Sequence, residues 1–290
     1  MDADSLSVGE VLAGAAESLR RAGVAEPRRE AGSLLSHVTG RDRTFLLTHP
    51  EDRLAPGQLA ELRAAVARRA AGEPLQYVTG RQDFYGLEFE VTPDVLIPRP
   101  ETELLVEAAL GLLKEARAPL VCDVGTGSGC IAVALLVSRP DARAHALDIS
   151  PAALAVAARN AARHGVGGRF TPLVSDCFDA FAGRDPAPRF DIILSNPPYV
   201  AERHLEGLQR EVRDHEPRVA LTPGGDGLAV IRRLLAGAPR HLAPGGHLLF
   251  EIGFDQHERV RALVDGDAWR LLDIHPDLQG IPRIVALRLA

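Results

Sequence analysis

The stretch from residue 120 to residue 148 constrains the fold more than any other part of the chain. Leu120–Val124 is an apolar run typical of a buried strand, and the glycine-rich turn Gly125–Gly129 follows it directly. An apolar segment of helical length comes next, and then a second strand that ends at Asp148. This order of strand, tight loop, helix and strand predicts an α/β fold.

The glycine turn and Asp148 together predict a site for a nucleoside cofactor. An acidic residue at the tip of the second strand can accept hydrogen bonds from both ribose hydroxyls. A dinucleotide fingerprint would need its third glycine where Cys130 stands. The observed Gly-x-Gly-x-Gly spacing behind Asp123 instead lets the backbone approach an amino-acid moiety, which favours S-adenosylmethionine over NAD.

A second motif, Asn196-Pro197-Pro198-Tyr199, follows the strand-like run of residues 190–195. Two successive prolines remove two N–H donors, so the turn presents mainly acceptors. The Asn196 side-chain oxygen and the Pro197 carbonyl can each accept one hydrogen of a planar –NH2 group, while the Tyr199 ring lies against its plane. The motif therefore predicts a catalytic site for a planar amide or exocyclic amine. Taken alone, the four residues are also compatible with an ordinary tight turn.

Three further segments are candidates for ligand contacts. Asp176 and Cys177 end the next strand, where they would flank an adenine ring, although a surface turn is the alternative. Arg99 lies between two prolines at the start of a helix, facing the expected cofactor pocket, and a plain helix start is its alternative. The long polar segment 201–227 predicts a lid or recognition loop.

The hydrophobic period divides the chain into three parts. Residues 1–75 contain three amphipathic helical stretches and predict a small helical domain. On its last helix, Arg63, Arg68 and Arg69 lie off the apolar stripe, which indicates a solvated face or a docking surface for an acidic partner. Residues 76–99 alternate with a period of two and predict a linking β-hairpin. Residues 100–290 contain both predicted ligand-site motifs and are expected to form the catalytic domain.

Composition excludes several classes of protein. The net charge of −6 and the aromatic content of 4% are unlike those of a protein that grips nucleic acid, so no nucleic-acid partner is expected. Neither a membrane span nor a signal peptide is apparent, which predicts a cytoplasmic protein, and we expect a monomer. The three cysteines and ten histidines show no metal-ligand spacing, so reduced, buried thiols and no metal are expected.

Several motifs distributed over most of the chain identify a family. They are Gly72-Glu73-Pro74-Leu75-Gln76-Tyr77, Ile97-Pro98-Arg99-Pro100-Glu101-Thr102-Glu103, Asp123-Val124-Gly125-Thr126-Gly127-Ser128-Gly129, Asn196-Pro197-Pro198-Tyr199 and Glu216-Pro217-Arg218. With these motifs the chain resembles the protein N5-glutamine methyltransferases of the PrmC/HemK type. That family modifies the glutamine of the Gly-Gly-Gln motif in peptide chain release factors.

The resemblance implies a Rossmann-like, seven-stranded, S-adenosylmethionine-dependent methyltransferase domain with an antiparallel last strand. It also implies that the preceding helical domain helps to hold the release factor. Asn196, Pro197 and Tyr199 are the predicted catalytic residues, and Pro198 and Arg99 join them in binding the substrate. The expected cofactor contacts are Gly125, Thr126, Gly127, Ser128, Gly129, Asp148, Asp176, Cys177 and Asn196. Cys177 stands where family members often carry a bulkier residue. An adenine-N6 methyltransferase acting on DNA or RNA is the alternative function, because it would use the same acceptor edge.

Overall fold

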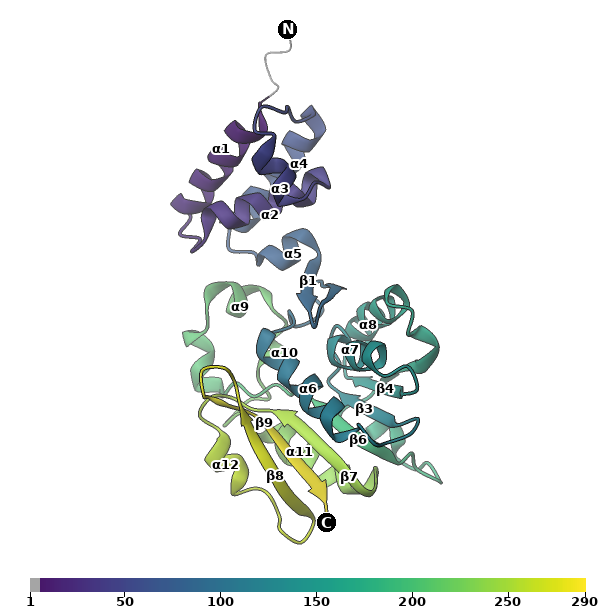
Figure 1. The fold of residues 1–290 in the computed structure, drawn as a ribbon. Coiled ribbons are helices and arrows are strands. Elements are labelled where there is room, and N and C mark those ends of the chain that lie inside the picture. Colours follow the sequence, from purple (N-terminus) through teal and green to yellow (C-terminus); the bar gives the residue numbers. More distant parts are fainter. Residues whose placement is uncertain (1–5) are drawn as a thin grey trace. The chain divides into compact units, whose positions relative to one another are not determined.

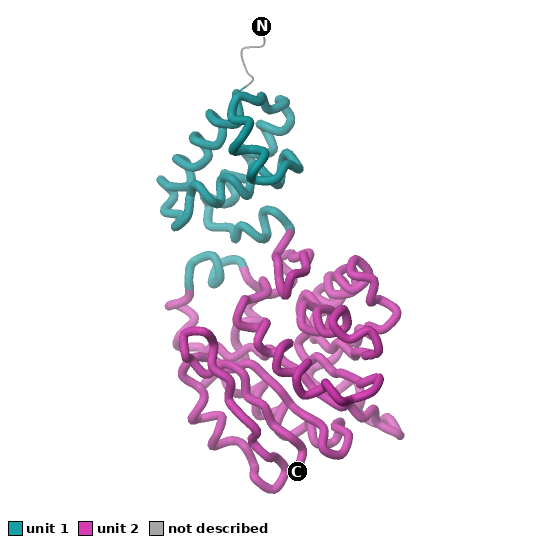
Figure 2. Tube along the Cα trace, in the orientation of Figure 1, with its two compact units in different colours: residues 1–80, 209–215 teal, residues 81–208, 216–290 magenta. Residues whose placement is uncertain are grey.

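The structure, a computed structural model, describes residues 6–290 and divides them into two compact units (Figure 2). Of the described residues, the first unit contains 6–80 and 209–215, and the second contains 81–208 and 216–290. The structural boundary lies beyond residue 75 because the next helix packs with the first unit. Val78 is part of that unit's buried core, and Leu75 packs against it.

The first unit is a bundle of short helices around one apolar core. Its helices are α1 (Val8–Arg21), α2 (Pro27–Thr39), α3 (Arg43–Thr48), α4 (Pro56–Ala70), α5 (Leu75–Thr79) and α9 (Arg210–His215). Ser7 and Glu10 form a capping box at the start of α1, in which each side chain satisfies a backbone N–H of the other residue.

Arg69 on α4 departs from the expected solvated face, because it is only 7% exposed. Its guanidinium pairs with Glu30 on α2 at 2.5 Å and with Glu211 on α9 at 2.9 Å. A buried cation needs such partners to offset its lost hydration. Arg68 pairs with Glu73. Interactions within the unit therefore occupy two of the three arginines that suggested a docking surface.

The predicted hairpin is present, and it belongs to the second unit. Strands β1 (Arg81–Phe84) and β2 (Leu87–Glu90) pair antiparallel around Tyr85 and Gly86, both of which have positive φ angles. This is the geometry of a tight hairpin turn. Phe84 and Phe89 enter the main core of the unit, so the hairpin is anchored rather than a free linker.

Asn160 on α8 (Pro151–Arg163) fastens this hairpin to the glycine turn. Its Oδ1 accepts the Glu90 N–H at 2.8 Å, and its Nδ2 donates to the Glu90 and Ser128 carbonyls at 3.0 and 2.9 Å. Asn160 is fully buried, so removing its side chain leaves three backbone groups unsatisfied.

We expect Asn160→Ala to lower the free energy of unfolding by roughly 2–4 kcal/mol, since buried groups that lose a partner cost about 1–3 kcal/mol each, not fully additively. Urea unfolding measures this loss. Arg159→Ala is the matched control, because it breaks an ion pair to Glu90 on the exposed side of the same helix. That variant should lose no more than about 1 kcal/mol. Equal losses of unfolding free energy in the two variants would contradict the role of Asn160 as the anchor of the hairpin.

The second unit is built on a seven-stranded sheet. Its strands are β3 (Leu120–Val124), β4 (Arg143–Asp148), β5 (Phe170–Val174), β6 (Phe190–Ser195), β7 (Leu242–Glu251), β8 (Trp269–Pro276) and β9 (Pro282–Leu289). Their order is β5-β4-β3-β6-β7-β9-β8. The last strand in the chain, β9, runs antiparallel to both neighbours, while the other adjacent pairs are parallel. The expected Rossmann-like, seven-stranded α/β fold is confirmed.

Helices cover both faces of this sheet (Figure 1). On one face α6 (Glu103–Leu112), α7 (Cys130–Ser138) and α8 share a buried core with the hairpin. On the other face α11 (Ala229–Gly237) and α12 (His257–Arg261) pack with Phe178 and Phe181. Neighbouring strand residues alternate between the two cores, as Leu248 and Leu249 do, because successive side chains point to opposite faces.

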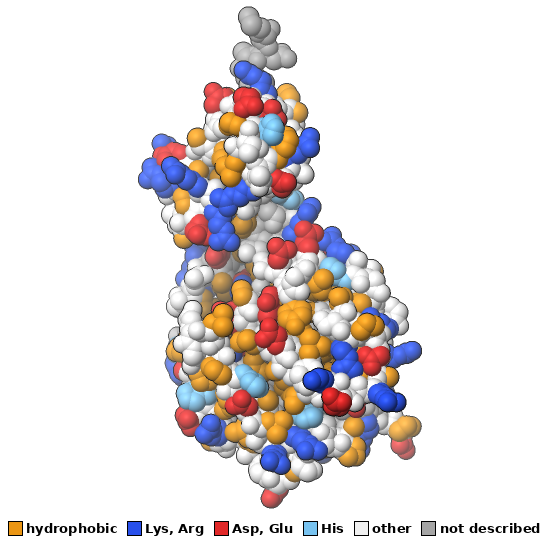
Figure 3. Space-filling view, in the orientation of Figure 1, with side chains coloured by type: hydrophobic (Ala, Val, Ile, Leu, Met, Phe, Trp, Pro, Cys, Tyr) orange, Lys and Arg blue, Asp and Glu red, His pale blue; other side chains and the backbone are white. Residues whose placement is uncertain are grey.

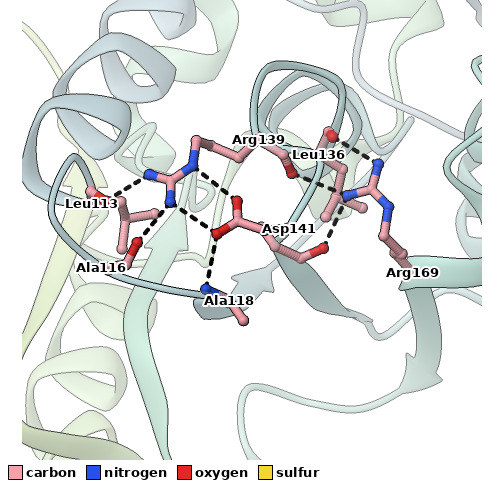
Figure 4. A network of polar contacts seen from close by, with 8 residues as sticks. Leu113, Ala116, Ala118, Leu136, Arg139, Asp141 and Arg169 are labelled. Atoms are coloured by element: carbon pink, nitrogen blue, oxygen red, sulfur yellow. Dashed lines mark hydrogen bonds and ion pairs between the residues drawn. The ribbon is translucent and has the colours of Figure 1, made fainter.

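Arginine side chains fix the loops at the amino ends of β3 and β4 (Figure 4). Arg139 donates to the carbonyls of Leu113 and Ala116 at 2.6 and 2.8 Å, and Asp141 accepts the Ala118 N–H at 2.8 Å. Arg169 donates to the Leu136 carbonyl at 2.9 Å. These bonds satisfy carbonyls at helix ends. The polar side chains at the amino ends of these strands therefore hold the loops in place.

The cysteines match expectation, since Cys122, Cys130 and Cys177 are free and buried. Within residues 6–290, no helix is long and apolar enough to cross a membrane. No group of three or more His, Cys, Asp or Glu side chains in this part of the chain could hold a metal ion.

Candidate functional site

The carboxyl ends of β3, β4 and β6 meet at one edge of the sheet. The chain leaves β3 toward β4 and β5 and later returns to the other side of β3 as β6. Ligands of open α/β sheets bind at such a point of reversal. A cavity of about 200 Å³ lies here. Its walls include Asp94, Val95, Leu96, Gly125, Gly127, Asp148, Ile149, Ser175, Asp176, Cys177, Ser195, Pro197, Pro198, Val219, Thr222 and Pro223.

The three glycines of the turn have different surroundings. Gly125 and Gly127 line the cavity, and a Cβ added at either would meet no atom within 4 Å. A ligand can therefore approach their backbone closely. A Cβ at Gly129 would instead lie 3.1 Å from the Ala157 Cβ. Gly129 thus allows the close packing of the turn on α8, and it does not line the cavity.

Asp148 holds the glycine turn and faces the cavity. Its Oδ2 accepts the Gly127 N–H at 2.8 Å, and its Oδ1 accepts the Ser150 N–H at 2.9 Å. Burial raises the pKa of this carboxyl, and the backbone N–H groups partly offset that effect. Each oxygen retains a lone pair for a further donor. Asp148 is therefore placed to accept two hydroxyl groups of a ligand.

Thr126 and Ser128 are buried in the turn and do not line the cavity. The Thr126 hydroxyl donates to Asp123 at 2.7 Å. Burial raises the pKa of Asp123 to about 7. The Thr126 and Ser128 side chains therefore support the loop from its buried side.

Asp176 and Cys177, the residues predicted to flank an adenine, both line the cavity. The Asp176 carboxylate pairs with Arg233 at 2.6 Å. Cys177 has a φ of 49°, and its carbonyl accepts the Ser175 hydroxyl at 2.8 Å. Burial raises the pKa of its thiol, so the neutral form lies against the cavity.

Two apolar walls of the cavity were missed by sequence reasoning. Ile149 is 52% exposed and Val219 is 56% exposed, although both are aliphatic. Exposed aliphatic side chains on a cavity suit a flat, apolar ligand surface. Ile149 directly follows Asp148 at a strand tip, which is the signal that could have identified it. Val219 lies in the segment 201–227, so part of this segment forms the wall of the cavity.

The Asn196–Tyr199 motif stands at the end of β6, next to this cavity. Pro197 and Pro198 line the cavity, whereas the side chains of Asn196 and Tyr199 join a buried polar network. Asn196 Nδ2 donates to Thr102 Oγ1 at 3.0 Å. Asn196 Oδ1 remains as the acceptor of this amide. The predicted acceptor edge is thus compatible with the observed orientation.

Arg99 is held by Glu216, which is buried. Glu216 Oε1 pairs with the Arg99 guanidinium at 2.5 Å, and Oε2 accepts the Ile97 N–H at 3.1 Å. Arg99 does not line the cavity. Its guanidinium remains partly exposed, so it keeps donors for another group.

Gly227 supports the motif from the segment that follows. It has a φ of 80°, and a Cβ there would lie 2.3 Å from the Tyr199 carbonyl oxygen. The same carbonyl accepts the Gln256 side-chain amide at 2.9 Å. Only glycine fits between these groups.

We expect Gly227→Ala to lower turnover by about tenfold or more, because the Tyr199 backbone must move and misplaced groups lose alignment. Gly224→Ala is the matched control, since Gly224 has a φ of 81° but no atom within 4 Å of an added Cβ. The control carries the same backbone strain without the collision. Steady-state kinetics of both variants test this, and equal losses would attribute the effect to strain alone.

Comparisons with known proteins decide the family. A model described as the PrmC N-terminal domain matches residues 10–80, and one described as the methyltransferase small domain matches residues 101–260. The chain is 46% identical to a release factor glutamine methyltransferase of Cereibacter sphaeroides, over 98% of this chain and 99% of the relative. This chain belongs to the release factor glutamine methyltransferase family. A relative of the same name in Bordetella pertussis is 47% identical, over 89% of this chain and 93% of that one.

A solved structure of low sequence identity shares the fold of this chain. The catalytic domain of hMettl16, solved with an RNA hairpin, matches with a TM-score of 0.52 at 13% identity. The match covers 81% of this chain and 82% of that domain. At this identity the likeness concerns the fold alone.

S-adenosylmethionine is the cofactor of this methyltransferase family member, and the cavity fits it. The open backbone at Gly125 and Gly127 admits a main-chain-like group, and the Asp148 carboxylate suits a diol. The aliphatic walls at Ile149 and Val219 suit a nucleobase.

Proposed function

We propose that this enzyme methylates the side-chain amide nitrogen of the glutamine in the Gly-Gly-Gln motif of peptide chain release factors. The observation that carries the proposal is the hydrogen bond from Asn196 Nδ2 to Thr102. This bond turns the Nδ2 group of Asn196 toward Thr102, which leaves Asn196 Oδ1 as an acceptor for a substrate –NH2 group. The names of the relatives supply the protein that bears this group.

The residues of the motif act by alignment. An amide nitrogen is a poor nucleophile, because its lone pair is delocalised into the carbonyl. Asn196 Oδ1 and the Pro197 carbonyl each hold one hydrogen of the substrate amide, which favours a pyramidal nitrogen whose lone pair points in one direction. Tyr199 packs against the amide plane.

The cofactor, when bound, supplies a methyl group on a positively charged sulfur. We assign its ribose to Asp148 and its amino-acid end to the backbone of the glycine turn at Gly125 and Gly127. Thr126, Ser128 and Gly129 support that turn, and Asp176 and Cys177 lie beside the adenine. Asn196 was also expected to contact the cofactor, but Ser195, Pro197 and Pro198 line the cavity and Asn196 does not, so we assign the Asn196 side chain to the substrate.

Recognition of the release factor body needs more surface than one glutamine provides. We assign this docking to the first unit and the segment 201–227, and contact with the substrate backbone to Arg99.

The acidic balance of the chain, with a net charge of −6, disfavours a nucleic-acid substrate. Figure 3 shows acidic and basic side chains interspersed over the visible face of the second unit, without a continuous basic stripe. We assign the enzyme to the reducing cytoplasm, which the free, buried thiols support.

The test follows transfer of a labelled methyl group to four substrates: a release factor, the same factor with its Gly-Gly-Gln glutamine changed to alanine, a Gly-Gly-Gln peptide, and DNA or RNA. We expect labelling of the intact factor, weak labelling of the peptide, and none of the alanine variant. Label on nucleic acid but not on the factor would favour the adenine-N6 alternative. A peptide as good as the intact factor would refute the docking assignment.

A further inference from the structure

A buried carboxylate lies behind the Asn196–Tyr199 motif. Glu251 ends β7, the strand beside β6, and is only 1% exposed. Its Oε2 accepts the Thr102 hydroxyl at 2.6 Å, and its Oε1 accepts the Tyr199 hydroxyl at 3.0 Å. The carboxylate therefore joins three segments that are far apart in the sequence.

The direction of these hydrogen bonds follows from the number of hydrogens. Thr102 has one hydroxyl hydrogen, and Glu251 accepts it. The contact between Thr102 Oγ1 and Asn196 therefore requires Asn196 to donate through Nδ2. An ionised carboxylate can only accept hydrogen bonds. Glu251 therefore sets the direction of both hydrogen bonds in the series from Asn196 through Thr102 to Glu251. A donor in its place would allow the Asn196 amide to reverse.

We propose that Glu251 is a positioning residue for methyl transfer. This rests on the proposed function, because the substrate amide is what Asn196 aligns. Through Thr102, Glu251 makes Asn196 present its oxygen and not its –NH2 group to the substrate. Through its bond to the Tyr199 hydroxyl, it fixes the ring that packs on the amide plane.

Protonation of Glu251 should have the same effect as replacing it by a donor. Burial raises the pKa of this carboxyl, while the Thr102 and Tyr199 hydroxyls and the charge of Arg283 on β9 lower it, and Glu101 opposes ionisation. A protonated Glu251 must donate one hydrogen, which can reverse the bond to Thr102. Turnover should therefore fall as the pH falls through the raised pKa of this carboxyl.

The experiment compares Thr102→Val, Thr102→Ser and Glu251→Gln in the full chain, with an intact release factor as substrate. Thr102→Val keeps the side-chain shape and removes the hydroxyl, whereas Thr102→Ser retains the hydroxyl. We measure kcat, KM, the cofactor dissociation constant and the pH profile. Wild-type enzyme that fails to label the release factor would refute the proposed function before any variant is compared.

We expect Thr102→Val to lower kcat by about tenfold or more while cofactor affinity stays within about threefold, a loss confined to the transition state. Thr102→Ser should recover most of that turnover. Glu251→Gln should lower kcat and abolish the acidic limb of the kcat profile, measured at saturating cofactor so that protonation of Asp148 does not contribute. A Thr102→Val enzyme within about threefold of wild type would overturn the proposal. Parallel losses of kcat and cofactor affinity in both Thr102 variants would also overturn it, because they indicate a scaffold role. If Thr102→Val does not fold, the Glu251→Gln profile decides, and an unchanged acidic limb refutes the proposal.

Discussion

Replacing Asn196 by alanine should lower the turnover of release factor methylation by about a hundredfold or more, whereas the cofactor should bind almost as tightly as before. The variant removes the acceptor that aligns the substrate amide, and this alignment matters most in the transition state. Loss of one preorganised hydrogen-bonding group at a reacting centre typically costs about 10²–10³ in kcat. The side chain of Asn196 does not line the cofactor cavity, so binding of the cofactor should change little.

Single-turnover kinetics and calorimetry with S-adenosylmethionine measure the two effects separately. Circular dichroism confirms that the variant is folded. Turnover within about threefold of wild type would contradict the acceptor-edge mechanism, since it corresponds to well under 1 kcal/mol of barrier. A loss of cofactor affinity as large as the loss of kcat would move Asn196 from the substrate site to the cofactor site.

The Asp148→Ala variant should bind the cofactor at least about tenfold more weakly, because charge-assisted hydrogen bonds contribute about 1.5–3 kcal/mol each. The structure adds a second reason for this loss. Asp148 also accepts the Gly127 N–H, so its removal releases the turn that approaches the ligand. Wild-type affinity should also decline in acid, since burial raises the pKa of the Asp148 carboxyl.

The matched control for Asp148 is Asp273→Ala. Asp273 is a 62% exposed carboxylate on β8, at the opposite edge of the sheet from β5 and β4. It tests whether losing one negative charge alone weakens binding of a positively charged cofactor. Calorimetry should find its dissociation constant within about twofold of wild type, since distant surface charges are screened. An unchanged constant in folded Asp148→Ala would remove Asp148 from the site.

The parts of the site that sequence predicted are those encoded within one short segment. The glycine turn and Asp148 lie in a single βαβ unit, and the Asn196–Tyr199 turn follows its own strand. Their positions at one sheet edge follow from parallel strands. The partners of Asn196 could not be predicted in this way. Thr102 and Glu251 are 149 residues apart, and nothing local indicates that they meet.

Contacts between residues far apart in the sequence also explain where the fold differs from the sequence prediction. The alternation within residues 76–99 correctly predicted the hairpin of β1 and β2, because strand alternation is local. Its predicted start was wrong, since residues 75–79 form the helix α5. That Asn160 anchors this hairpin depends on a helix 70 residues further along the chain. Likewise, Arg69 has the pattern of a surface residue on its own helix, and its burial comes from Glu30 and Glu211 on two other helices.

Tandem mass spectrometry of a release factor after incubation with the enzyme and S-adenosylmethionine tests the central claim most directly. Fragmentation locates the added methyl group within the Gly-Gly-Gln peptide and distinguishes the side-chain amide from the backbone. We predict one methyl group on the glutamine amide nitrogen, present with wild-type enzyme and nearly absent with Asn196→Ala at equal time. A methyl group on any other residue would contradict the account. So would a release factor that stays unmodified after prolonged incubation with folded, cofactor-bound enzyme.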